Sequence, residues 1–140
     1  MLEETWGGVE VAVHDELIDA SALPALIASL GGQGDGLLTY RVGGDAWEIV
    51  TLDALIEDQG IGSALIRAVR KRARNAGARR LWLITTNDNM RAIRFYQRRG
   101  FDLVALHRDA VTRARALKPG IPREHDGIAL RHELEFEMVP

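Results

Sequence analysis

The sequence contains no cysteine and no apolar run that approaches the roughly 20 residues needed to span a bilayer. Without cysteine the chain can form no disulfide, no thiolate metal site and no cysteine-borne covalent intermediate. The N-terminal residues Met1 to Thr5 are acidic where a secretory signal peptide is basic. We therefore expect a soluble, cytoplasmic protein with no membrane partner.

The chain also lacks internal repeats, linkers and low-complexity segments, so nothing in the sequence divides its 140 residues. This length suits one ordinary domain, which on folding buries about two-thirds of the surface that the unfolded chain exposes. With cysteine absent, the side chains most typical of metal sites are the histidines His14, His107, His125 and His132. They are scattered without metal-ligand spacing. We expect a single domain over residues 1–140 that binds no metal.

Charge is distributed unevenly along the chain. Residues 1–59 hold 12 acids and Arg41 as their one base, whereas residues 60–140 hold 17 bases and 8 acids; the halves carry −11 and +9, a net −2. This split suits a polyanionic cofactor on the basic half and a cationic substrate on the acidic half, although solvated faces of one domain explain it equally well. The basic residues between Arg67 and Arg80 follow one predicted helix toward its C-terminus, where cations favour the macrodipole, so we expect no nucleic-acid partner.

Hydrophobic alternation predicts several strands in the first part of the chain. They are expected at Gly8 to His14, Ala25 to Ala28, Leu37 to Val42 and Trp47 to Leu52. Between them, Asp15 to Leu23 is predicted as a short irregular or helical connection and Gly31 to Gly36 as a turn. Gly43-Gly44 supplies the positive φ angles of a tight hairpin.

From Trp47 onward the pattern changes to strand, helix, strand, helix, strand, which indicates right-handed crossovers and parallel pairing. Helices are predicted at Ile61 to Asn75, Asn89 to Arg99 and Asp109 to Leu117, and strands at Leu81 to Thr86, Phe101 to His107 and Leu130 to Met138. Gly120 to Asp126 is predicted as a loop. In the last strand apolar residues alternate with glutamates, which predicts an acidic outer face. This strand is a candidate sheet edge that pairs with a second copy, so a homodimer is a candidate assembly.

Two motifs stand at the starts of the first two predicted helices. Gln59-Gly60-Ile61-Gly62-Ser63 opens one, and Asn89 to Phe101 reads N-x-x-A-x-x-F-Y-x-x-x-G-F. At these residues, within roughly residues 24 to 107, the sequence resembles the GNAT superfamily of acyl-CoA-dependent N-acyltransferases. The resemblance implies an α/β (α+β) fold with a mixed, twisted central sheet of about six to seven strands flanked by helices. It also implies transfer of an acetyl group from acetyl-CoA to a primary amine by direct attack in a ternary complex.

The glycine turn is the predicted phosphate site. Gly60 and Gly62 allow a diphosphate to approach the backbone N–H groups, and the helix that they open adds a partial positive charge. A dinucleotide fingerprint does not fit, because it needs a third glycine where Leu65 stands. The resemblance implies that the cofactor is bound by Leu52, Gln59, Gly60, Ile61, Gly62, Ser63, Asn87, Asn89 and Tyr96.

The turn departs from the family pattern Q/R-x-x-G-x-G/A, because Glu57, followed by Asp58, stands at the first position. Carboxylates about 4 Å from the phosphates would be repelled by roughly 1 kcal/mol in water and about 4 kcal/mol at an effective dielectric of about 20. In the alternative, Asp58 caps the helix or both acids point to solvent. Repulsion would favour a non-catalytic acyl-CoA binding or sensing domain, or a GNAT-fold interaction module without cofactor.

Tyr96 is the predicted catalytic acid. Its helical spacing from Ala92 is also that of an ordinary core residue. Within the motif, the resemblance implies that its hydroxyl faces the thioester sulfur and protonates the departing thiolate. A phenol of pKa about 10 keeps its proton at neutral pH, and a thiol of pKa about 8.5 is a leaving group worth assisting. Asn89 either only caps its helix or also contacts the cofactor, as the resemblance implies, and Asn87 is the weaker candidate.

The general base is predicted among three carboxylates. Glu48 is the first candidate, since the corresponding strand of GNAT enzymes often supplies a base glutamate, and Asp53 and Glu57 follow. The alternative for Glu48 is a strand-edge carboxylate that faces solvent. If the strand bulges around Leu52, as in the family, backbone N–H groups there would polarise the thioester carbonyl.

The acceptor is predicted only by class. The acidic first half favours a cationic amine such as a polyamine, an aminoglycoside-like amine or a lysine side chain. Glu48 and His107 are the candidates for contacting it. The segment Asp109 to Asp126, whose helix carries Arg113, Arg115 and Lys118, either covers the acceptor pocket or simply packs against the domain.

Overall fold

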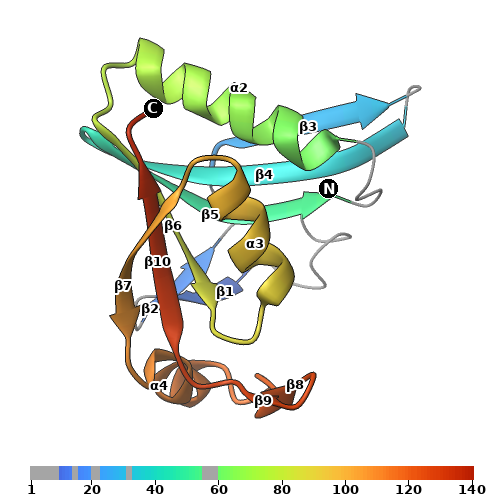
Figure 1. Cartoon of the computed structure of the whole chain (residues 1–140), viewed down its shortest axis with the longest axis vertical. Coiled ribbons are helices and arrows are strands. Elements are labelled where there is room, and N and C mark those ends of the chain that lie inside the picture. The colour runs from blue at the N-terminus through green and yellow to red at the C-terminus, as the bar shows by residue number, and fades with distance from the viewer. Residues whose placement is uncertain (1–9, 14–15, 20–22, 31–32, 55–59) are drawn as a thin grey trace. The chain divides into compact units, whose positions relative to one another are not determined.

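The computed structural model describes residues 10–13, 16–19, 23–30, 33–54 and 60–140. Within these residues the chain forms ten strands and three helices (Figure 1). The strands are β1 (Glu10–Val13), β2 (Glu16–Asp19), β3 (Ala25–Leu30), β4 (Gln33–Gly43), β5 (Ala46–Ala54), β6 (Arg80–Thr86), β7 (Asp102–His107), β8 (Glu124–His125), β9 (Ile128–Ala129) and β10 (Glu133–Met138). The helices are α2 (Ile61–Asn75), α3 (Met90–Arg98) and α4 (Ala110–Leu117).

Six strands form one mixed sheet in the order β3-β4-β5-β6-β10-β7. The pairs β3-β4, β4-β5 and β10-β7 are antiparallel. Two short pairs, β1-β2 and β8-β9, lie outside this sheet. The predicted α/β fold with a mixed sheet and flanking helices is therefore confirmed.

Residue contacts group the chain into two compact units. The first unit consists mainly of Asp19–Trp82, and the second mainly of Leu83–Met138. The first unit contains β3, β4, β5 and α2, and the second contains α3, α4 and the strands from β7 to β10.

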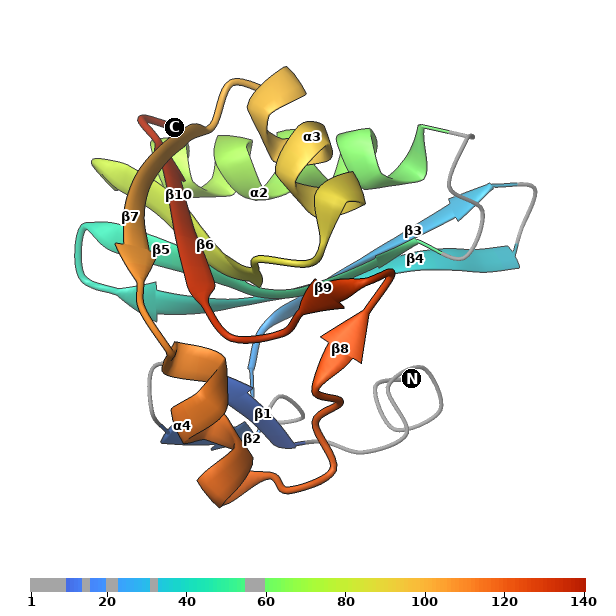
Figure 2. The same ribbon diagram turned by 60° about the horizontal axis from the view of Figure 1, so that its bottom comes forward.

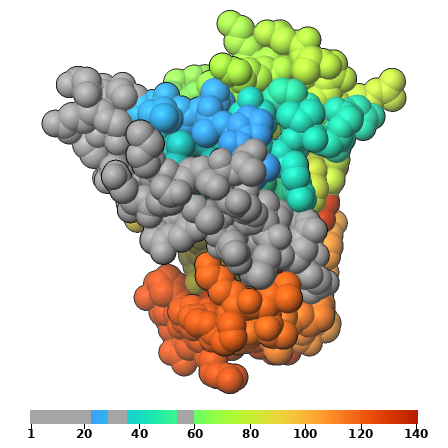
Figure 3. All heavy atoms as spheres, turned by 180° about the vertical axis from the view of Figure 1, so that it is seen from behind, coloured from blue at the N-terminus to red at the C-terminus, as the bar shows by residue number. Residues whose placement is uncertain are grey.

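In the first unit, α2 packs along β3, β4 and β5 (Figure 1). Its start and end agree with the predicted helix, and Gly77, with φ 79°, follows its C-terminus. The buried side of the helix is formed by Ile61, Gly62, Leu65, Ile66, Val69 and Ala73. A Cβ on Gly36 of β4 would lie 2.4 Å from Ile61 Cγ2, so only glycine allows this approach of strand and helix. On the surface in Figure 3, β3 (blue) lies beside the cyan residues of β4 and β5.

In the second unit, the aromatic side chains of α3 and its neighbours form the core. The Tyr96 ring meets Phe101 edge-on, with ring centroids 5.5 Å apart. It also contacts Phe136, a fully buried residue of β10. Gly100, with φ 95°, follows the end of α3 as predicted.

Two local predictions were wrong. The connection predicted to be irregular or helical contains the strand β2. The loop predicted at Gly120 to Asp126 contains β8, which pairs with β9 around Asp126 and Gly127. Both turn residues have positive φ, 51° and 77°, which is the backbone of a tight two-residue hairpin. An Asp-Gly pair is a known signal for such a turn, so this hairpin could have been found from the sequence.

The prediction that the last strand is a sheet edge was also wrong. β10 lies between β6 and β7, and the edge strand at that end of the sheet is β7. The acidic face of β10 is not an outer face either, because Glu133 is only 4% exposed. The prediction of a homodimer was based on β10 as an edge strand, and this basis is therefore removed.

The β4-β5 hairpin lies where it was predicted, and Gly44 has φ 64°, but Gly43 has no positive φ because it is the last residue of β4 and pairs with Ala46. Both strands are longer than predicted. β4 begins at Gln33, inside the predicted glycine turn, and β5 runs to Ala54 and so includes Asp53.

Candidate functional site

The start of α2 has the local geometry of an anion site. Gly60 precedes the helix in the left-handed conformation, with φ 75° and ψ 9°. Among the described residues no side chain caps the helix, and a Cβ on Gly60 would meet no atom within 4 Å. The first N–H groups of a helix have no partner within the helix and lie at the positive end of its dipole. As far as the described residues go, the backbone here is thus open to a negatively charged group.

The other residues of the glycine motif have different surroundings. Ile61 and Gly62 are buried, so only their backbone could serve a ligand. Ser63 is half-buried and has an interaction partner of its own. Gln59, Glu57 and Asp58 lie outside the described residues, and their expected effects on a cofactor stay predictions.

The start of α3 differs from that of α2, because a side chain caps it. Asn89 Oδ1 accepts a hydrogen bond from the Ala92 backbone N–H at 3.1 Å. The predicted cap is confirmed. The cofactor contact predicted for Asn89 stays a prediction.

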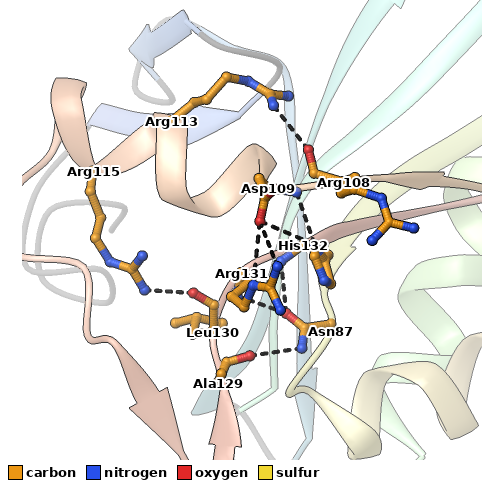
Figure 4. Close-up of polar contacts among 9 residues, drawn as sticks. All are labelled: Asn87, Arg108, Asp109, Arg113, Arg115, Ala129, Leu130, Arg131 and His132. Carbon is orange, nitrogen blue, oxygen red and sulfur yellow. Dashed lines mark hydrogen bonds and ion pairs between the residues drawn. The ribbon is translucent and has the colours of Figure 1, made fainter.

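Asn87 has a role that sequence reasoning missed. Its Oδ1 accepts from the backbone N–H groups of Arg131, at 3.0 Å, and His132, at 2.9 Å. Its Nδ2 donates to the Ala129 carbonyl at 2.9 Å, and its own backbone N–H donates to the His132 carbonyl (Figure 4). The side chain therefore ties the turn after β6 to the segment before β10. Both lone pairs of its amide oxygen are occupied, which leaves one N–H for a cofactor.

Tyr96 is 7% exposed and packs against aromatic rings on several sides. Burial, which penalises the charged phenolate, raises the pKa of Tyr96 above its ordinary value. Within the described part of the chain its hydroxyl has no hydrogen-bond partner. The phenol therefore keeps its proton. Within the described residues it donates no hydrogen bond to another group of the protein.

A β-bulge shapes the face of β5 that carries the candidate bases. Tyr40 pairs with Ile49 and Thr39 pairs with Thr51, so Val50 is the extra residue. Such a bulge changes which side chains share a face of the strand. It lies at Val50, two positions before the predicted Leu52.

The bulge places Glu48 and Thr51 on the same face of β5. Arg41 Nη2 lies 2.8 Å from Glu48 Oε1, and the Thr39 and Thr51 hydroxyls are hydrogen-bonded. Since Arg41 and Thr39 alternate on β4 and share a face, their partners do too. Asp53, two residues after Thr51, belongs to that face as well. The two described base candidates therefore lie on one side of β5.

Glu48 is 3% exposed and paired with Arg41, which overturns the alternative of a solvent-facing carboxylate. Asp53 is half-buried and also has an interaction partner. Either group would have to exchange a contact with the protein for one with an amine or a water molecule. Their assignment as bases stays a prediction.

His107, a candidate for contacting the acceptor, lies at the end of β7. Its Nε2 is 2.8 Å from Glu135 Oε1 on β10, and both side chains are partly buried. One ring nitrogen is therefore already engaged, and the other remains for any further contact.

The segment Asp109 to Asp126 is bound closely to its neighbours in the second unit. The Asp109 backbone N–H donates to His132 Nδ1 at 2.8 Å, and the Asp109 carboxylate pairs with Arg131 (Figure 4). Arg115 donates to the carbonyls of Ile121, Pro122 and Leu130. Figure 3 shows this part of the chain, in orange, as one continuous surface. The cover over an acceptor pocket stays a prediction.

Sequence reasoning also missed a contact next to α3, where His125 Nδ1 lies 2.9 Å from Asp88 Oδ2. The two residues are 37 positions apart, and no local pattern predicts that they meet. Groups of three or more side chains that could hold a metal ion were not found among the described residues. In the same part of the chain, every helix is too short or too polar to cross a membrane.

Comparisons with known proteins agree on one family. The family model described as Acetyltransferase (GNAT) family matches residues 10–101. The uncharacterized protein YdhI of Bacillus subtilis (strain 168) is 41% identical over 136 residues, which cover 96% of this chain and 85% of YdhI. A GNAT family acetyltransferase from Elizabethkingia anophelis, solved with acetyl-CoA bound, is 19% identical with a TM-score of 0.74, covering 86% of this chain and 78% of that one. A Bacillus subtilis acetyltransferase solved with CoA is 20% identical with a TM-score of 0.70, covering 83% and 76%.

Proposed function

Because the chain belongs to the GNAT family of acetyltransferases, we propose that it transfers the acetyl group of acetyl-CoA to a primary amine. The amine attacks the thioester directly within a ternary complex, since the chain has no cysteine to carry an acyl intermediate. The whole chain acts as one cytoplasmic domain. The acceptor is a cationic small molecule or a protein amine.

The observation that carries this proposal is the open start of α2. A diphosphate needs bare backbone at close range, and Gly60 provides it in a conformation that side chains disfavour. The fit to the pyrophosphate of CoA is therefore good at this position. Gly60, Ile61, Gly62 and Ser63 would hold the phosphates through their backbone, with Gln59 and Leu52 as further contacts.

Tyr96 is the proposed acid. Its buried phenol holds its proton, and its hydroxyl is not engaged within the described residues. As the C–S bond breaks, the developing thiolate receives a hydrogen bond and then the proton from Tyr96 Oη. Because burial raises the pKa of Tyr96, its phenolate is high in free energy. The phenolate must therefore take up a proton again before the next turnover.

Glu48 and Asp53 are the proposed bases on the bulged face of β5. The bulge itself supports a second role for this strand, because a residue outside the ladder has a backbone N–H that can point away from the neighbouring strand. Such a group can stabilise the oxyanion that forms when the amine attacks.

Thermal unfolding with and without acetyl-CoA tests the cofactor assignment. One-site binding predicts about 2.7 kcal/mol of stabilisation at a hundredfold excess over Kd, enough to move Tm by several degrees. The shift should weaken with 3′-dephospho-CoA. Absence of a shift up to millimolar acetyl-CoA would overturn the proposal and favour an interaction module without cofactor.

Release of the CoA thiol in the presence of spermidine, kanamycin and a lysine peptide tests the transfer itself. An enzyme releases CoA faster with at least one of these amines than with buffer. Binding of acetyl-CoA without release in any of them, or with hydroxylamine, would favour a sensing domain instead.

A further inference from the structure

β7 is the edge strand of the mixed sheet, next to β10 (Figure 2). An edge strand presents a row of backbone N–H and C=O groups that can pair with another chain. Among the described residues eight large apolar side chains are exposed, and three of the eight are on this one strand. They are Leu103, Val104 and Leu106, with exposed fractions of 52%, 45% and 51%. Exposed apolar side chains that gather in this way mark an interaction surface, whereas single ones are ordinary.

A β-bulge brings two of these side chains onto one face of β7. Leu106 pairs with Leu134 of β10, and Leu103 pairs with Phe136, so three steps along β7 match two steps along β10. Side chains two positions apart on a strand share a face, which holds for Leu134 and Phe136. Their partners Leu103 and Leu106 therefore share that face, although residues three positions apart lie on opposite faces of a regular strand.

The two ends of β7 carry opposite charges. Asp102 is its first residue, and Arg108 directly follows its last residue, His107. Both Asp102 and Arg108 are exposed, and within the described residues neither charged group has an ion pair or a hydrogen bond. When two copies of the strand pair antiparallel, each acidic end lies against the basic end of the other copy, whereas parallel pairing aligns like charges. The strand is therefore complementary to itself in the antiparallel direction.

We propose that β7 pairs antiparallel with β7 of a second copy of this chain, which joins the two sheets across a two-fold axis. Because Leu103 and Leu106 share a face, each can lie opposite the other across this axis. In this register Asp102 lies opposite His107 of the second copy and next to its Arg108. The leucines of both copies then form an apolar cluster at the centre of the contact, and the charged residues form its rim. This homodimer uses the sheet edge at β7 and does not depend on the proposed function.

Sedimentation velocity of the full chain is the first test. At micromolar concentration the wild type should sediment with twice the 15.5 kDa of one chain. Leu106→Lys places a lysine of each copy in the apolar cluster and should raise the Kd of the dimer about tenfold or more. The control is Ile27→Lys, because Ile27 is 67% exposed on β3, the edge strand at the other end of the sheet. This control variant should remain a dimer.

Exchange of the charges tests the antiparallel direction. Asp102→Arg alone and Arg108→Asp alone each bring like charges together at both ends of the contact, and we expect each to raise Kd about tenfold. The double variant restores opposite charges at both ends, so its Kd should return close to that of the wild type. A double variant that dimerises more weakly than either single variant would overturn the antiparallel pairing.

Disulfide formation tests the register, and it gives a clear result because the natural chain has no cysteine. Leu103→Cys and Leu106→Cys are purified separately and then mixed under oxidising conditions. The mixture should form covalent dimers, because a thiol of one variant lies opposite a thiol of the other. Either variant alone should form few, since its two thiols are about 10 Å apart along the strands, beyond the span of a disulfide.

Three results would count against the dimer at β7. A wild type that is monomeric at every concentration would overturn the proposal and would mean that the bulge protects the edge from pairing. A dimer that Ile27→Lys dissociates and Leu106→Lys leaves intact would also overturn it, because the interface would lie elsewhere. No more covalent dimer in the cysteine mixture than in either variant alone would overturn the register. Circular dichroism spectra equal to that of the wild type should show that each variant is folded.

Discussion

The starts of the helices α2 and α4 look alike in their backbone but differ in what surrounds them. Each begins after a residue in the left-handed conformation, Gly60 with φ 75° and Asp109 with φ 57°, and neither has a side-chain cap among the described residues. At α4, however, the Asp109 N–H donates to His132, and the Val111 N–H donates to the Arg131 carbonyl. The chain itself therefore already bonds two of the N–H groups that an anion would need.

At α2 the situation is the reverse. In the part of the chain that the structure describes, the N–H groups of Ile61 and Gly62 have no such backbone partner. The comparison shows that a left-handed residue before a helix does not by itself make an anion site. What matters is whether neighbouring chain segments have already satisfied the first N–H groups. By this criterion we propose α2 as the binding helix, and the role of Tyr96, on the capped helix α3, as the acid stays a prediction.

The largest expected effect comes from removing the acid on α3. Tyr96→Phe deletes only the hydroxyl, so the aromatic packing with Phe101 is kept and the free energy of unfolding should change little. Acetyl transfer should fall about 100-fold or more, because general acid assistance to the thiolate is lost. The measurements are steady-state CoA release and thermal unfolding with acetyl-CoA.

Binding should separate from turnover in this variant. The acetyl-CoA thermal shift of Tyr96→Phe should equal that of the wild type if α2 provides the binding. A lost shift would show that Tyr96 contributes to affinity, and unchanged turnover would remove it as the acid.

Much of the helical architecture could be predicted from local pattern. α2 agrees with its predicted bounds because its apolar residues recur at helical spacing and a glycine with positive φ follows it. Asn89 was recognisable as a cap from its position before a helical run. The order of the strands in the sheet could not be predicted from local sequence pattern. The interior position of β10 depends on pairing with β6 and β7, which no local pattern records.

The residues of the candidate site also differ in how far the sequence predicts them. Gly60 and Tyr96 belong to contiguous motifs, so the sequence alone indicated them. The roles of Asn87 and of Glu48 depend on contacts with distant residues, the backbone at 129–132 and Arg41 respectively. The bulge at Val50 requires knowing the register of two strands. Such features follow from tertiary packing and stayed hidden in the sequence.

A smaller effect should follow from adding a methyl group at the start of α2. Gly60→Ala forces a side chain into the left-handed region, which costs about 1–2 kcal/mol of folding free energy, and it also places a Cβ in the approach to the backbone. Loss of one charge-assisted hydrogen bond to a phosphate would weaken acetyl-CoA binding about tenfold. Unfolding measurements and isothermal titration with acetyl-CoA report the two quantities.

Gly77→Ala is the matched control for that change. Gly77 has φ 79° just after the other end of α2, and a Cβ there would likewise meet no atom within 4 Å. It should therefore lose about the same 1–2 kcal/mol of stability but bind acetyl-CoA as the wild type does. Equal affinities in the two variants would mean that the open start of α2 is not the phosphate site.

The smallest expected effect is at the capped helix. Asn89→Ala removes the acceptor for the Ala92 N–H and should lower the free energy of unfolding by about 1 kcal/mol. Asn89→Ser should restore most of this loss, because serine caps helices nearly as well as asparagine. If the side chain only caps α3, any loss of acetyl-CoA affinity in Asn89→Ala should accompany its loss of stability. The affinity of Asn89→Ser, in which the cap is restored, should then equal that of the wild type. An affinity that falls in both variants would instead show a cofactor contact from Asn89, and the capped and uncapped helices would then both take part in binding.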